Sequence, residues 1–140
     1  MTKRRVLFLC THNSARSQMA EGFLRALAGN RFEAASAGTE ATRIHPLAIR
    51  VMDEVGIALG RHSSKTFDEF LTQRWDCVIT VCDNANERCP IFPAWTTRLH
   101  WSFEDPSAAA GSEEEKLKTF RRVRDEILAK IRGWTSLSEA

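Results

Sequence analysis

The sequence predicts one α/β domain built on an open sheet of four parallel strands, with helices on both faces of the sheet. Strand and helix signals alternate along the chain, which is the pattern of strand–helix–strand units with parallel strands. Residues 77–81 form a β-branched, apolar run of the kind found in a central parallel strand. With 140 residues the chain can bury one hydrophobic core. We therefore expect a three-layer fold in which residues 1–140 form a single domain.

The first half of the chain is expected to contain two strands and two helices. Residues 5–9 are an apolar run and the first strand, and residues 32–37 are the second strand. Between them, residues 17–28 carry apolar side chains at every fourth position, as on the buried face of a helix. Pro46 is a typical first residue of a helix, and Gly56 closes that helix.

The second half is expected to add two strands and a long final helix. The strands are residues 77–81 and 97–101. Ser112 and Glu115 form a capping box at the start of the helix, and its apolar stripe continues to Ile131.

Three segments follow the carboxyl ends of predicted strands: those at Cys10, at Cys82 and after Trp101. In open parallel sheets, ligands bind outside the carboxyl ends of the strands. We therefore expect these three segments to share one pocket.

Composition excludes several classes of protein. A net charge of +2 gives no indication of a nucleic acid or an anionic membrane as partner. No apolar stretch approaches the roughly 20 residues of a membrane span, and the basic N-terminus lacks the apolar core of a signal peptide. We expect a cytoplasmic monomer. Thiols stay reduced in that compartment, so the four cysteines are expected to be catalytic, redox-active or buried.

The strongest functional signal is an octet between the first strand and the first helix. Small residues between a cysteine and an arginine let backbone N–H groups point inward at one spot, where the N-terminus of the helix adds partial positive charge. The guanidinium can clamp two oxygens of a tetrahedral anion, and the same field favours a nucleophilic thiolate. The predicted oxyanion-binding residues are Thr11, His12, Asn13, Ser14, Ala15, Arg16 and Ser17, and the nucleophile is Cys10.

A second cysteine pair, Cys82 and Cys89, follows the predicted central strand. Its spacing is not that of a metal site, and we expect none. If the segment between them were helical, their Cα atoms would lie about 10.5 Å apart along the axis, whereas a disulfide needs about 7 Å or less. Either the pair never bridges, or the segment unwinds when it does. The Asn and Asp residues between them favour weak helicity and thus the second alternative.

With both cysteine elements in view, the chain resembles the thioredoxin-coupled arsenate reductases, which share the fold of the low-molecular-weight tyrosine phosphatases. The resemblance covers nearly the whole chain. Its markers are residues 10–22, 36–38, 81–82, 89–90, 100–101, 105–106 and 122–127. The octet alone is shared with the phosphatases, and the two further cysteines at this spacing make the match specific to the reductases.

The resemblance implies a relay of three thiols. Cys10 would attack arsenate, Asp105 would protonate the departing oxygen, and Cys82 would then attack the sulfur of Cys10. Cys89 would next attack Cys82, so that thioredoxin could reduce an outward-facing Cys82–Cys89 disulfide. Ser17 would donate a hydrogen bond to the Cys10 thiolate, and phosphate or sulfate would compete with arsenate. No bound cofactor is expected.

Two residues depart from the family pattern. Position 12 is commonly glycine, whereas here His12 can tune anion affinity at the rim or be a tolerated surface side chain. Members with a potassium site hold the ion through residues matching Asn13, Glu21 and Ser36 and an aspartate at position 65. This chain has Lys65 there, and like charges a few Å apart repel. We expect the Lys65 ammonium to replace potassium and to pair with Glu21; the alternative is that it points to solvent.

Three other functions compete with this interpretation. A small tyrosine phosphatase would need Cys10, Arg16 and Asp105 without the other two thiols, and a weak phosphatase activity is expected in any case. A glutathione- or mycothiol-coupled arsenate reductase would need only Cys10, so the retained Cys82 and Cys89 argue against it. A noncatalytic oxyanion-binding module would gain nothing from an oxidation-prone cysteine in its binding loop.

Overall fold

The computed structural model describes residues 3–40, 42–59, 62, 64–82, 92 and 95–137. Four strands form one sheet in the order β2-β1-β3-β4, and every pair is parallel. The strands are β1 (Arg4–Cys10), β2 (Phe32–Gly38), β3 (Cys77–Thr80) and β4 (Thr97–His100). The four-stranded parallel sheet predicted from the sequence is confirmed, with strand ends shifted by one residue.

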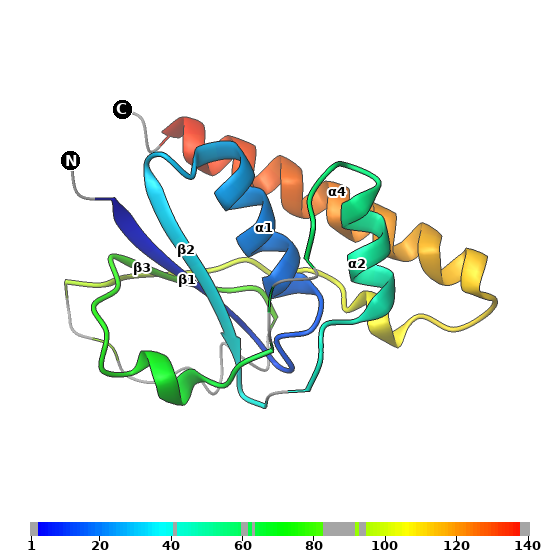
Figure 1. Cartoon of the computed structure of the whole chain (residues 1–140), viewed down its shortest axis with the longest axis horizontal. Helices are drawn as coiled ribbons and strands as arrows, with labels where there is room; N and C mark the ends of the chain where they lie inside the picture. The colour runs from blue at the N-terminus through cyan, green and yellow to red at the C-terminus, as the bar shows by residue number, and fades with distance from the viewer. Residues whose placement is uncertain are drawn as a thin grey trace.

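In the described part of the chain, three α-helices and two short 3₁₀ helices flank the sheet. Figure 1 shows the α-helices on one side of the sheet and the first 3₁₀ helix on the other, so both faces are covered by helical segments as predicted. The helices are α1 (Arg16–Ala28), α2 (Pro46–Asp53), α4 (Glu113–Leu137), η1 (Phe67–Phe70) and η2 (Pro106–Ala108). None of the described helices has the length and apolarity needed to cross a membrane.

Strand β1 is the buried centre of the fold. Its residues from Val6 to Cys10 are at most 2% exposed. Phe8 packs toward α4 through Trp101 and Trp134. Arg5 projects from the opposite face and lies over Trp75, which follows η1. The chain leaves β1 for β2 on one side and later returns to β3 on the other, so the loop after β1 lies at the topological switch point of the sheet.

Side chains at the helix N-termini fix where two helices begin. His45 Nδ1 accepts a hydrogen bond from the Leu47 N–H at 3.1 Å, and Pro46 is the first residue of α2. Ser112 Oγ accepts one from the Glu115 N–H at 3.2 Å, which is one half of the predicted capping box. These contacts satisfy N–H groups that have no partner within the helix.

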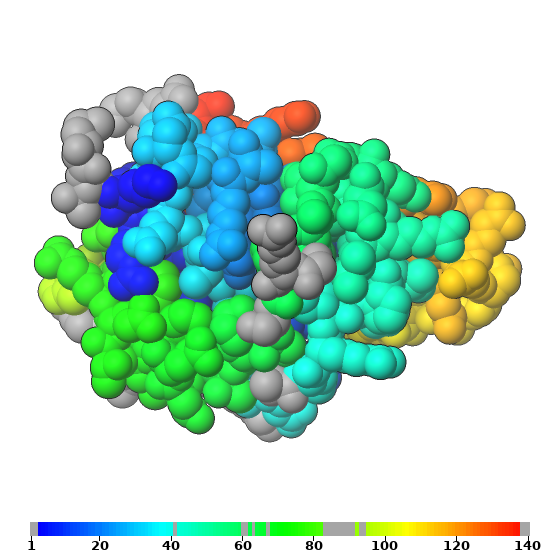
Figure 2. All heavy atoms as spheres, in the orientation of Figure 1, coloured from blue at the N-terminus to red at the C-terminus, as the bar shows by residue number. Residues whose placement is uncertain are grey.

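Glu54, just after α2, fastens that helix to α4. Its carboxylate accepts hydrogen bonds from Arg121 at 2.7 Å and from Arg124 at 2.9 Å. Figure 2 shows α2 and the first half of α4 side by side at one end of the molecule. The hydrogen bonds from the two guanidinium groups lower the pKa of Glu54 from 4.5 to about 2.

This lowered pKa predicts a pH dependence of stability. A carboxyl whose pKa is lower in the folded than in the unfolded state stabilises the fold above the unfolded value and loses that contribution as pH falls. We expect Glu54→Gln to unfold at a lower urea concentration than the wild type at pH 7. The difference should shrink as pH falls from about 4.5 toward about 2. Because Glu54 itself is exposed, we expect a small difference; a difference that grows on acidification would contradict the assignment.

Candidate active site

The predicted oxyanion loop joins the end of β1 to the start of α1. Cys10 is its first residue and is 2% exposed. Asn13 has a φ of 51°, a left-handed conformation that asparagine tolerates. Gly38, at the end of β2, lies so close that a Cβ there would come within 2.7 Å of the Asn13 nitrogen and the Thr11 oxygen. Only glycine therefore lets β2 support this loop.

Ser17 holds a hydrogen bond to the nucleophile. Its Oγ lies 2.8 Å from Cys10 Sγ, and Asn13 Nδ2 donates to the same oxygen at 2.9 Å. Since Ser17 accepts from Asn13, its own proton is available to point at the Cys10 sulfur. This is the donor predicted from the sequence.

The surroundings of Cys10 raise the pKa of its thiol on balance, whereas the loop alone predicts a lowered pKa. Burial raises the pKa of the Cys10 thiol above its ordinary value of 9.0, and the nearby Cys82 adds to this. Hydrogen bonds from Ser17 and the charge of Arg16 act in the predicted direction and lower that pKa. Their sum is smaller than the burial effect, because a thiolate buried among apolar strand residues loses its hydration.

Arg16 connects the oxyanion loop to the predicted general acid. Its Nη1 donates to the Phe103 carbonyl at 3.0 Å, and its Nη2 lies 3.7 Å from Asp105 Oδ2. The other oxygen of Asp105 accepts from the Ser107 hydroxyl at 2.6 Å and from the Ser107 N–H at 3.0 Å. One small cavity is lined by Cys10, His12, Ser14, Ala15, Arg16, Asp105 and Ser107. The acid and the nucleophile thus face the same space.

The second predicted thiol lies beside this loop. Cys82 follows β3, is 3% exposed, and has its Sγ 3.3 Å from Thr11 Oγ1. Thr11 follows Cys10 directly, so Cys82 contacts the residue next to the nucleophile. Cys89 falls outside the described residues. The small cavity joins Cys10 to the segment after β4 as expected, whereas Cys82 lies against the loop at Thr11 and does not line that cavity.

His12 lies at the rim of the site. Its Nδ1 is 3.4 Å from Glu40 Oε2, and both side chains are well exposed. The backbone of the loop is braced from the β2–α2 segment: Thr11 O accepts from the Glu40 N–H at 2.9 Å, and Ser14 O accepts from the His45 N–H at 2.9 Å. The loop is therefore held by contacts that no short motif reveals.

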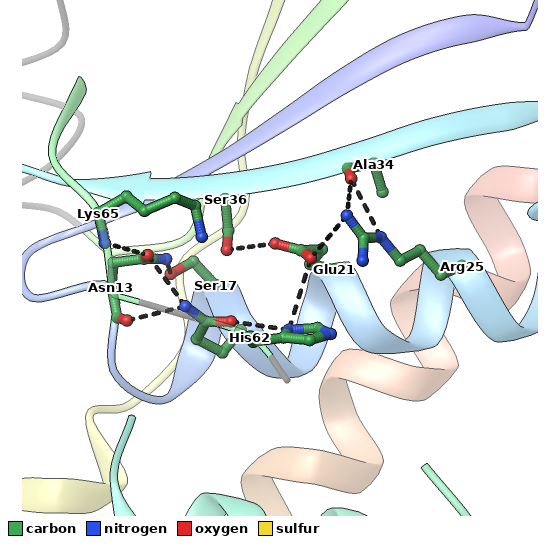
Figure 3. A network of polar contacts seen from close by, with 9 residues as sticks. Asn13, Ser17, Glu21, Arg25, Ala34, Ser36, His62 and Lys65 are labelled. Carbon is green, nitrogen blue, oxygen red and sulfur yellow. Dashed lines mark hydrogen bonds and ion pairs between the residues drawn. The ribbon is translucent and has the colours of Figure 1, made fainter. Parts of the chain in front are cut away.

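Behind the loop, Glu21 of α1 is the centre of a polar cluster (Figure 3). The carboxylate is 3% exposed and accepts from Ser36 Oγ at 2.6 Å. Its second oxygen lies 3.1 Å from Arg25 Nη2 and 3.5 Å from His62 Nδ1. Burial lowers the pKa of Lys65 from 10.5, while the charge of Glu21 raises it. The sequence alone singled out neither Arg25 nor His62.

Comparison with known proteins supports the resemblance. The family model described as "Low molecular weight phosphotyrosine protein phosphatase" matches residues 5–139. The chain is 46% identical over 132 residues to an arsenate reductase of Halalkalibacterium halodurans, covering 94% of this chain and 95% of that protein. The chain belongs to the low-molecular-weight phosphotyrosine protein phosphatase family, in its arsenate reductase branch.

Two solved structures agree with membership of this branch. An arsenate reductase in its phosphate-binding state superposes with a TM-score of 0.77 at 33% identity, covering 95% of this chain and 97% of that chain. A thioredoxin-dependent arsenate reductase of Corynebacterium glutamicum superposes with a TM-score of 0.75 at 30% identity. That alignment covers 97% of this chain and 62% of the other.

Proposed function

We propose that this member of the family reduces arsenate to arsenite with Cys10, Cys82 and Cys89 acting in turn, and that thioredoxin restores the thiols. The observation that carries the proposal is the second buried thiol: Cys82 Sγ lies 3.3 Å from a hydroxyl of the same loop that begins with Cys10. A phosphatase needs no sulfur at this position, since water releases its intermediate. The name of the Corynebacterium relative supports thioredoxin as the reductant.

In the first step, the Cys10 sulfur displaces one oxygen of hydrogen arsenate. The S–As bond forms as an As–O bond breaks, and the departing oxygen leaves as water, so that thiol and hydrogen arsenate give a thiol–arsenate adduct and water. Asp105 donates its proton to the leaving hydroxyl, which departs as water, and the proton released by the Cys10 thiol passes through a substrate oxygen to restore Asp105. Arg16 neutralises the adduct, which is still As(V).

In the second step, Cys82 attacks the sulfur of Cys10. The S–As bond breaks with its electron pair going to arsenic, which becomes As(III) and leaves as arsenite after taking up protons. The two cysteines are left as a disulfide. Cys89 then attacks Cys82 and releases Cys10 as a thiol, and a dithiol of thioredoxin reduces the Cys82–Cys89 disulfide. Each turnover consumes two electrons, which thioredoxin supplies. We place the protein in the cytoplasm, where such dithiols are kept reduced.

Thr11 is positioned to prepare Cys82 for the second step. A hydroxyl 3.3 Å from the Cys82 sulfur can donate to the thiolate and favour it over the thiol. We expect Thr11→Val to slow arsenate turnover by about tenfold, the order of one hydrogen bond to a charged group. Thr11→Ser keeps the hydroxyl and should retain most of the turnover. Equal losses in both variants would show that the side-chain shape, and not the hydrogen bond, is what matters.

The proposal is tested by arsenate-dependent oxidation of reduced thioredoxin, with thioredoxin reductase and NADPH as the recording system. We expect NADPH consumption that requires both arsenate and thioredoxin. Replacement of thioredoxin by glutathione and glutaredoxin should give little consumption. Turnover supported equally by glutathione would overturn the proposed partner, and hydrolysis of p-nitrophenyl phosphate without arsenate turnover would favour the phosphatase.

A further inference from the structure

The cluster around Glu21 stands where the resemblance implies a potassium ion. That ion would be held by Asn13, Glu21 and Ser36 and by an acidic residue at position 65, which here is Lys65. A monovalent cation needs oxygen atoms with lone pairs that no N–H or O–H group already occupies. The donors around each oxygen of the cluster decide whether it has such a lone pair.

Several of these oxygens already accept hydrogen bonds from donors of the chain itself. Asn13 Oδ1 accepts from the Lys65 N–H at 2.8 Å and from Gln18 Nε2 at 2.9 Å. One Glu21 oxygen accepts from Ser36 at 2.6 Å, and the other lies 3.1 Å from the Arg25 guanidinium. Figure 3 shows Arg25 of α1, Ser36 of β2 and Lys65 of the segment before η1 around Glu21 and Asn13. These donors occupy Asn13 Oδ1 and part of the Glu21 carboxylate, so few lone pairs of the cluster are left for a cation.

The charge balance leads to the same result. Arg25 and Lys65 bring two positive charges toward the single negative charge of Glu21. Gln18 donates to Asn13 with its Nε2, so its Oε1 faces His62 Nδ1 at 2.9 Å and that nitrogen must carry a proton. Burial lowers the pKa of His62 from 6.5, Glu21 raises it, and Arg25 and Lys65 lower it further. A potassium ion would meet a net positive surrounding and be repelled.

The Arg25 guanidinium is held in place beside Glu21 by contacts to β2. Its guanidinium donates to the Ala34 carbonyl from Nε at 3.2 Å and from Nη2 at 3.0 Å, and Nη2 also contacts Glu21. The guanidinium is thus fixed between α1 and β2. Lys65 approaches from the segment before η1, where the exposed Glu69 also attracts it. Arg25 contacts the buried Glu21 carboxylate directly, and Lys65, from another part of the chain, interacts with its charge.

We propose that Arg25 and Lys65 are built-in cations that replace a bound monovalent ion at Glu21, and that the residue at position 65 decides between the two arrangements. The cluster is linked to the nucleophile by four contacts. The Lys65 backbone N–H and Gln18 donate to Asn13, Asn13 donates to Ser17, and Ser17 contacts Cys10.

The test is thermal unfolding in potassium chloride and in choline chloride at equal ionic strength, with no arsenate or thioredoxin. It is therefore independent of the proposed function. We expect the wild type to show the same Tm in both salts. Lys65→Asp changes the charge at Glu21 by two units, and we expect potassium to raise its Tm by about 4 °C once the ion is tenfold above its Kd. Lys118→Asp, on the exposed face of α4, makes the same charge change elsewhere and should show no such rise.

A variant that folds only in potassium chloride would also support the proposal. If Lys65→Asp does not fold in either salt, Lys65→Asn provides an oxygen ligand with a milder change, and we expect a smaller potassium-dependent rise in its Tm. A potassium-dependent rise in the wild type would overturn the proposal. The same holds for a folded Lys65→Asp, or its Lys65→Asn substitute, that responds equally to the two salts.

Discussion

Cys82→Ser is expected to lower arsenate turnover at least about 1,000-fold while leaving hydrolysis of p-nitrophenyl phosphate within about threefold of the wild type. A serine hydroxyl at this position cannot attack the Cys10 sulfur and cannot deliver an electron pair to arsenic. Hydrolysis of an aryl phosphate uses the oxyanion loop and Asp105 only, since water attacks the intermediate. Comparison of the two rates in one preparation separates loss of the relay from loss of the fold.

Cys77→Ala is the matched control for this variant. Cys77 is a buried thiol at the start of β3, and burial raises its pKa to about 11, which makes it a poor nucleophile. We expect it to retain arsenate turnover. If Cys82→Ser reduced arsenate within about tenfold of the wild type, an external thiol would be resolving the Cys10 adduct, and the relay would be wrong.

Arg16→Lys is expected to lower kcat/KM for arsenate by about 100- to 1,000-fold, although the charge is kept. The guanidinium can present two parallel N–H groups to the anion, while its contacts to the Phe103 carbonyl and to Asp105 hold it toward the acid. An ammonium offers one point charge and cannot make this pair of contacts. The measurement is the steady-state rate over a range of arsenate concentrations.

Arg122→Lys provides the control for Arg16→Lys. Arg122 is an exposed residue of α4 that pairs with Glu104 and Glu126. We expect its kcat/KM to stay within about twofold of the wild type, as for an exposed ion pair. A loss of less than tenfold in Arg16→Lys would show that charge alone explains the arginine, in contradiction to the bidentate geometry.

The parts of the site that the sequence predicts well are those that are local in the chain. The oxyanion loop occupies eight consecutive residues, so the order of Cys10, Asn13, Arg16 and Ser17 already determines which atoms can meet. The strands were predicted for a similar reason, because apolar runs and their flanking turns are local signals. Cys82 could be placed beside the loop because it follows a strand that pairs with β1.

The parts that were missed depend on distant residues of ordinary type. Arg25 resembles any charged residue near the end of a helix, and His62 contacts Gln18 across 44 positions of sequence. Burial is likewise a property of the assembled fold, which is why the loop predicts groups that lower the pKa of Cys10 but not the larger effect that raises it. Lys65 could be singled out only through the resemblance, since nothing in its neighbours marks it.

The most direct test of the relay is disulfide mapping after a single turnover. Reduced protein is mixed with one equivalent of arsenate without thioredoxin, quenched by alkylation and analysed by peptide mass spectrometry. We predict a Cys82–Cys89 disulfide in the wild type and a trapped Cys10–Cys82 disulfide in Cys89→Ser. Arsenite formation with neither disulfide would contradict the three-thiol account.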